Sequence, residues 1–164
     1  MGVRMATEKL KFKIELYATT WDKPPHAEIL IDDKSHFKGY ITGTEEKPDL
    51  IEFEQELEED KEYNLIIMRS GKIMGQTVIN ENGDVLKDQL LHIKSMEIDE
   101  IDLGALVYEG IYTPRYPEPW ASQQCQAGVD LKESFKNVTV MGHNGTWRFT
   151  FGSPFYVWLL ENLY

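Results

Sequence analysis

The sequence has one cysteine and no long apolar run. With Cys125 alone among 164 residues, no disulfide can form within the chain. A membrane-spanning helix needs about 20 consecutive apolar residues, and no stretch approaches that length. The first residues, MGVRMATEKL, also lack the apolar core of a secretion signal. The sequence therefore predicts no disulfide framework, no membrane contact and no secretion signal.

Positive charge is scarce too. Lys and Arg number 17 against 28 Asp and Glu, which gives a formal net charge of −11. Such a surface repels the phosphate backbone of a nucleic acid unless basic residues cluster locally, and the sequence shows no such cluster. We therefore expect no nucleic acid partner.

The motifs of common enzyme classes are missing as well. The chain has no Gly-rich phosphate loop with lysine, no GxSxG, no HExxH and no CxxC pair. Two carboxylates for glycoside hydrolysis can be drawn from so many acids by chance, so their presence carries no information. The sequence favours a non-catalytic protein and leaves a small glycan hydrolase as the third alternative.

Alternation of apolar and polar residues is what the chain does have. Residues 10–16 read LKFKIEL, in which every second residue is apolar, as in a half-buried strand. Further strands are predicted at 88–99 and, as a closely spaced antiparallel meander, at 27–32, 37–42, 50–57 and 62–69. Residues 101–108 fit either a strand or a short packed segment.

Two hairpins are predicted from turn residues. Asn82-Gly83 lies between apolar flanks in residues 76–86, and this pair readily adopts the positive φ angles of a tight turn. A second hairpin is expected to join residues 137–142 to 145–151. After it, Ser153 can cap a short helix over residues 154–163, with Pro154 in its first turn.

These elements predict an all-β fold. Short antiparallel strands with one apolar face must bury that face, so we expect an antiparallel, jelly-roll-like β-sandwich, with a closed barrel as the second choice. The length fits one domain over residues 9–164, after a flexible N-terminus at 1–8.

Residues 109–124 read EGIYTPRYPEPWASQQ and combine prolines with aromatics. Three prolines, each without a backbone donor, disfavour a helix and predict an extended arm outside the sheet ladders. Its rings suit either the apolar face of a sugar or a partner protein, because Tyr and Trp combine a flat apolar surface with a polar group. The predicted ligand-binding residues are Tyr112, Tyr116 and Trp120, together with Trp147, for which a core position is the alternative.

Aspartates at strand ends suggest calcium. Ca²⁺ recruits loop carboxylates and backbone carbonyls, although solvated turn residues are the alternative and no EF-hand spacing occurs. The residues predicted for this site are Asp84, Asp88, Asp99 and Asp102.

The run from AEILID through EYNLIIMRS to KDQLLHIKSMEIDEIDLG resembles small calcium-dependent, xylan-binding carbohydrate-binding modules over about half the chain. The resemblance implies a glycan-binding sandwich, with Asp88 as the position that matches a calcium ligand. Residues 108–124 and 141–164 instead resemble small uncharacterised proteins of tailed bacteriophages of aquatic bacteria.

Two functions follow from these resemblances. The first is a phage-encoded, non-catalytic carbohydrate-binding sandwich whose partner is a glycan. The second is a structural virion protein whose arm and C-terminal helix dock on other virion proteins or on further copies of the chain. Both place the protein in the virion or in the host cytoplasm during assembly.

Overall fold

The strand that the sequence indicates most clearly lies within the longest strand of the protein. The computed structural model describes residues 6–73 and 75–163. In it, β1 spans Thr7–Thr19, and every second side chain from Leu10 to Leu16 is buried, as the alternation predicts. The predicted flexible N-terminus lies outside the described residues over 1–5, whereas Thr7 and Glu8 already belong to β1.

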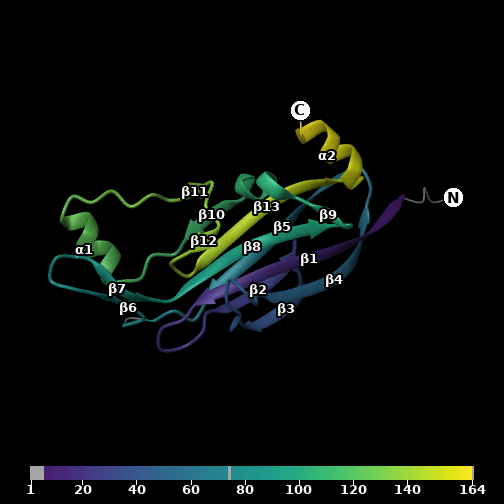
Figure 1. The fold of residues 1–164 in the computed structure, drawn as a ribbon. Helices are drawn as coiled ribbons and strands as arrows, with labels where there is room; N and C mark the ends of the chain where they lie inside the picture. The colour runs from purple at the N-terminus through teal and green to yellow at the C-terminus, as the bar shows by residue number, and fades with distance from the viewer. Residues whose placement is uncertain (1–5, 74, 164) are drawn as a thin grey trace.

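Two antiparallel sheets face each other and enclose one apolar core (Figure 1), which confirms the predicted β-sandwich. The first sheet has the order β12 (Val140–Met141), β8 (Leu90–Ile98), β1, β4 (Asp49–Glu58), with β9 (Ile101–Asp102) on β8. The second has the order β11 (Phe135–Lys136), β10 (Ile111–Pro114), β13 (Gly145–Ser153), β5 (Lys61–Ser70), β2 (His26–Ile31), β3 (Lys34–Tyr40).

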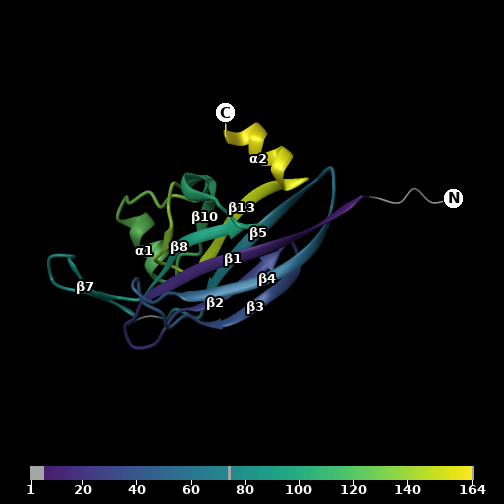
Figure 2. The same ribbon diagram turned by 45° about the vertical axis from the view of Figure 1, so that its right-hand side comes forward.

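Smaller elements lie at the two ends of the sandwich. The hairpin of β6 (Thr77–Ile79) and β7 (Val85–Asp88) lies at the same end as α1 (Trp120–Gln126), and α2 (Phe155–Leu163) lies at the opposite end, as Figures 1 and 2 both show. Residues Gly104–Glu109 form a 3₁₀ helix, η1, so this stretch is the short packed segment rather than a strand. No helix in the described ranges is long and apolar enough to cross a membrane.

The predicted meander is wrong after its first hairpin. β2 pairs with β3, but β4 pairs with β1 in the first sheet, and β5 pairs with β2 and β13 in the second. The chain therefore changes sheet between β3 and β4 and again between β4 and β5. The short loops between the predicted strands did not reveal these changes of sheet, because a loop of a few residues can lead to a strand in either sheet.

The two predicted hairpins have different outcomes. The β6–β7 hairpin is confirmed: Gly83 has a φ of 84°, and the Asn80 side chain accepts hydrogen bonds from the backbone of Asn82 and Asp84, both 2.9 Å long. The second is wrong, because β12 pairs with β8 whereas β13 pairs with β5 and β10. The intervening residues 142–144 carry the chain from one sheet to the other.

The proline-rich segment is not an extended arm throughout. Residues 111–114 form β10, which pairs with both β13 and β11, and Trp120 is the first residue of α1. Pro114 ends the strand and Pro119 directly precedes the helix, two positions where a missing backbone donor costs little. The expectation that residues 112–120 lie outside the ladders is therefore wrong for 112–114, and the expectation of an extended arm without a helix is wrong for 120–124, which belong to α1.

The predicted C-terminal helix is present, but its cap comes from elsewhere. Ser153 is the last residue of β13, and the carboxylate of Glu8 in β1 accepts hydrogen bonds from the backbone N–H of Phe155 (2.7 Å) and from the Ser153 hydroxyl. A carboxylate suits a helix N-terminus because the first N–H groups there lack partners within the helix.

Candidate functional site

The end of the sandwich that carries α1 and the β6–β7 hairpin brings several loops together; we call it the loop end. It consists of residues 70–73, 75–77, 86–89, 115–120 and 142–144. At its base lies Arg69, which is fully buried although it is charged. Its guanidinium donates to the carbonyl of Met141 and to the backbone and side-chain oxygens of Gln89, at 2.6 and 2.7 Å. Burial lowers the pKa of Arg69 to about 10, and the guanidinium ties the two sheets together.

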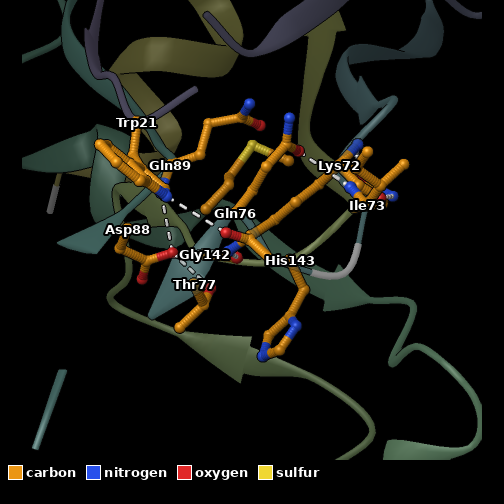
Figure 3. A network of polar contacts seen from close by, with 12 residues as sticks. Trp21, Lys72, Ile73, Gln76, Thr77, Asp88, Gln89, Gly142 and His143 are labelled. Atoms are coloured by element: carbon orange, nitrogen blue, oxygen red, sulfur yellow. Dashed lines mark hydrogen bonds and ion pairs between the residues drawn. The ribbon is translucent and has the colours of Figure 1, made fainter. Parts of the chain in front are cut away.

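A second cation, Lys72, follows Arg69 by three residues and belongs to the loop end itself. Its ammonium donates to Asp88 (2.7 Å) and to the carbonyl of Gly142 (2.6 Å), as Figure 3 shows. The same Asp88 oxygen accepts from the Thr77 hydroxyl at 2.6 Å and from the backbone of Gln89 at 2.8 Å. This network joins the hairpin base to the loop that crosses between the sheets.

Asp88 is held in its ionised form. Partial burial raises its pKa, but the hydrogen bonds from Lys72 and Thr77 outweigh burial, so the net pKa is below the usual value. The side chains of Lys72 and Asp88 are 10% and 20% exposed, so the pair is shielded from solvent and little weakened by salt.

Three half-buried rings, Tyr116, Trp120 and His143, form what we call the aromatic cluster. The ring centroids of Tyr116 and Trp120 are 6.0 Å apart, and the imidazole of His143 lies 5.2 Å from the first and 5.6 Å from the second. The Tyr116 hydroxyl donates to the carbonyl of Lys132 at 2.6 Å. The cluster therefore combines two chain segments that are more than twenty residues apart.

His143 is held in place by its backbone. The hydroxyl of Tyr112 donates to the His143 carbonyl (2.6 Å) and accepts from the His143 N–H (2.9 Å). Burial lowers the pKa of the imidazole, and the positive charges of Lys72 and Arg69 lower it further. The ring is therefore neutral at neutral pH.

Two of the four predicted ligand-binding aromatics belong to the core. Tyr112 is 4% exposed and Trp147 is 0% exposed. They are direct partners in the pairing of β10 with β13, on the face that points inward. Neither ring is accessible to a ligand, and Tyr112 instead serves the site by holding His143.

The four aspartates predicted for calcium do not form one site. Asp84 and Asp88 precede β8, whereas Asp99 and Asp102 follow it, and nine residues of strand separate the two pairs by roughly 30 Å. Each pair has other partners: Asp84 accepts from Asn80, and Asp102 accepts from the backbone of Gly104. Within the described ranges, no three His, Cys, Asp or Glu side chains are arranged to hold a metal ion.

Sequence reasoning missed Arg69, Lys72 and His143. A signal existed for Arg69, because the alternation that buries Leu65 and Ile67 also points residue 69 into the core. His143 was assigned to a hairpin turn, so its position beside the proline-rich segment was hidden. A further missed contact is that of Lys87, whose ammonium lies 3.8 Å from the ring centroid of Trp21.

The comparisons with known proteins agree with this fold. No family model matches the sequence, and no curated protein matches it. Among solved structures, the selenomethionine form of vCBM60, reported with two families of calcium-dependent carbohydrate-binding modules, matches with a TM-score of 0.50 and 6% identity, over 85% of this chain and 89% of that chain. vCBM60 in complex with galactobiose matches with a TM-score of 0.47 and 6% identity, over 85% and 96% of the two chains. The chain thus has the fold of calcium-dependent carbohydrate-binding modules over most of its length, at low sequence identity.

Proposed function

We propose that this protein binds carbohydrate, without catalysing its breakdown, at the aromatic cluster. The observation that carries the proposal is the grouping of half-exposed Tyr116 and Trp120 around His143. The C–H face of a sugar packs on such rings, while its hydroxyls need polar partners nearby. The imidazole of His143 is a polar group within the cluster itself, whereas the side-chain amide of the next residue, Asn144, is engaged by the backbone of Lys72.

The fold supports this function, because the structurally similar vCBM60 is a carbohydrate-binding module. A hydrolase needs a protonated carboxyl group as general acid. Asp88, the half-buried carboxylate of the loop end, has a lowered pKa and is already engaged by Lys72, so it is unsuited to that role.

Calcium has no part in the proposed site. The similar modules are calcium-dependent, but the residues here do not fit the ion. Ca²⁺ needs six to eight oxygen ligands, and one oxygen of the best-placed carboxylate, Asp88, already accepts from the Lys72 ammonium, the Thr77 hydroxyl and the Gln89 N–H.

The test is affinity electrophoresis through gels that contain soluble neutral and acidic polysaccharides, followed by calorimetry with the best binder. We expect Trp120→Ala to weaken binding by roughly 2 kcal/mol or more and to leave the melting temperature nearly unchanged. Tyr156→Ala is the matched control, because that ring is 50% exposed on α2, at the opposite end of the sandwich. Unchanged binding by Trp120→Ala, or no binding of the wild type to any glycan, would overturn the proposal.

A second function is assembly with other protein chains, as in a phage virion. The observation that favours it is an apolar stripe on α2, formed by Tyr156, Val157, Leu160 and Leu163, which are 50–62% exposed. Light scattering over a range of concentrations tests self-assembly, and Leu160→Glu should abolish any association that this stripe supports.

A further inference from the structure

The polar network beneath the aromatic cluster contains two cations and one carboxylate. Lys72 pairs with Asp88, but every oxygen that accepts from Arg69 belongs to an uncharged group. Among the described residues, Arg69 has no ion pair, and its Nε lacks a hydrogen-bond partner. The carboxylate that acts on Arg69, that of Asp88, is already bonded to Lys72. The fully buried guanidinium therefore keeps a positive electrostatic potential around it, because the protein interior screens charge poorly.

The positive potential of Arg69 and Lys72 acts on the aromatic cluster. Arg69 donates to the carbonyl of Met141 and Lys72 donates to the carbonyl of Gly142, and the next residue is His143. Both cations act on the imidazole: after burial, they are the main causes of its lowered pKa, and Asp88 opposes them only as a weaker effect. The loop end together with Arg69 carries four cationic side chains, of Arg69, Lys72, Lys87 and Arg115, against the two carboxylates of Asp88 and Glu118. The surface that presents the rings is therefore locally positive, in a protein whose net charge is −11.

The distant acidic residues do not cancel this local charge. Four of them, Glu52, Glu54, Glu56 and Glu58, lie on the outward face of β4, where Glu52 and Glu54 pair with lysines of β1. Exposed charges are screened beyond about 10 Å at 0.1 M salt, whereas the buried cations remain effective at the cluster.

We propose that the ligand of the aromatic cluster is an anionic carbohydrate, a chain that carries carboxylates such as uronic acid units. This inference rests on the proposed function and narrows its substrate class. The rings pack on the sugar face, and the excess positive charge beneath His143 attracts the carboxylate. A neutral glycan can also pack on the rings, but it has no carboxylate for this positive charge to attract.

The experiment compares two forms of one polymer, polygalacturonate and its methyl ester, which share a backbone and differ in charge. We expect the free acid to bind at least tenfold more tightly in 50 mM salt, and the difference to shrink as salt rises. Equal or tighter binding of the ester overturns the inference and leaves carbohydrate binding intact. Absence of binding to both polymers and to every other glycan tested overturns the proposed function as well.

Charge variants separate an electrostatic role from a structural one. Lys72→Met removes a positive charge and should lower the preference for the free acid. Asp88→Asn removes a negative charge with almost no change in shape, and it should raise that preference. If the network were purely structural, both variants would weaken binding of both polymers in parallel. If Lys72→Met fails to fold, Asp88→Asn alone decides, because an unchanged or reduced preference contradicts the inference.

Discussion

The backbone of Gly110 packs directly against the indole ring of Trp147. A Cβ atom on Gly110 would come within 2.2 Å of two carbons of that ring, a separation that no folded protein tolerates. Because Trp147 is fully buried, it cannot swing aside without disturbing the core. We therefore expect Gly110→Ala to destabilise the protein by about 1–3 kcal/mol or more, measured by urea unfolding.

Gly39→Ala is the control for this prediction. Gly39 lies in β3, and its Cβ would meet a carbon of Phe37 at 3.4 Å, an ordinary contact. Its stability should change by less than about 1 kcal/mol. Equal effects of the two substitutions would show that the Gly110–Trp147 contact is not as tight as described.

The sequence was informative wherever structure depends on local pattern. The alternation in residues 10–16 predicted β1, the period-two stretches together predicted a sandwich, and Ser153-Pro154 predicted the C-terminal helix. It was uninformative about which strands pair, because β13 lies beside β5, some eighty residues earlier in the chain. Pairing across that distance depends on the complete core, and no local signal records it.

The candidate site, too, was predicted from the sequence only in part. The aromatics of residues 109–124 were recognised as unusual, but composition did not separate Tyr112, which faces the core, from Tyr116, which does not. That distinction comes from the pairing of β10 with β13. The third ring, His143, reaches the cluster because the chain crosses between sheets there, and the predicted hairpin concealed that crossing.

The cap of α2 can be tested through Glu8. Replacing it with Gln weakens the acceptor for the backbone N–H of Phe155 and removes a negative charge from the helix N-terminus. We expect a loss of about 1 kcal/mol in the free energy of unfolding. Glu58→Gln, on the exposed side of β4, should have almost no effect. Equal stability of both variants would mean that α2 does not depend on this cap.

Calcium should not stabilise this protein. An ion that binds the folded state alone raises the melting temperature by mass action, but Asp88 is paired with Lys72, and Asp99 lies at the other end of β8. We expect the same melting temperature, within about 1 °C, in millimolar Ca²⁺ and in chelator. A rise in Ca²⁺ that Asp88→Asn abolishes would contradict the geometry described for this residue.

Stability should fall as the solution becomes mildly acidic, because of two histidines. Burial lowers the pKa of both His92 and His143, and the charge of Arg69 lowers both further. The unfolded chain therefore binds more protons than the folded one once the pH drops below the ordinary histidine pKa of about 6.5. The stabilisation is complete above that pH and is lost as the pH falls toward the native values.

Unfolding free energies at pH 7.5, 6.5 and 5.5 measure this effect. We expect a decrease over the lower step, and a smaller decrease for the double variant His92→Gln/His143→Gln, which cannot take up those protons. The lowered pKa of Asp88 does not interfere, because its effect falls near the ordinary aspartate pKa of about 4 and below. A wild type that becomes more stable between pH 6.5 and 5.5, or a double variant with an undiminished slope, would show that burial and the nearby cations do not hold these imidazoles neutral.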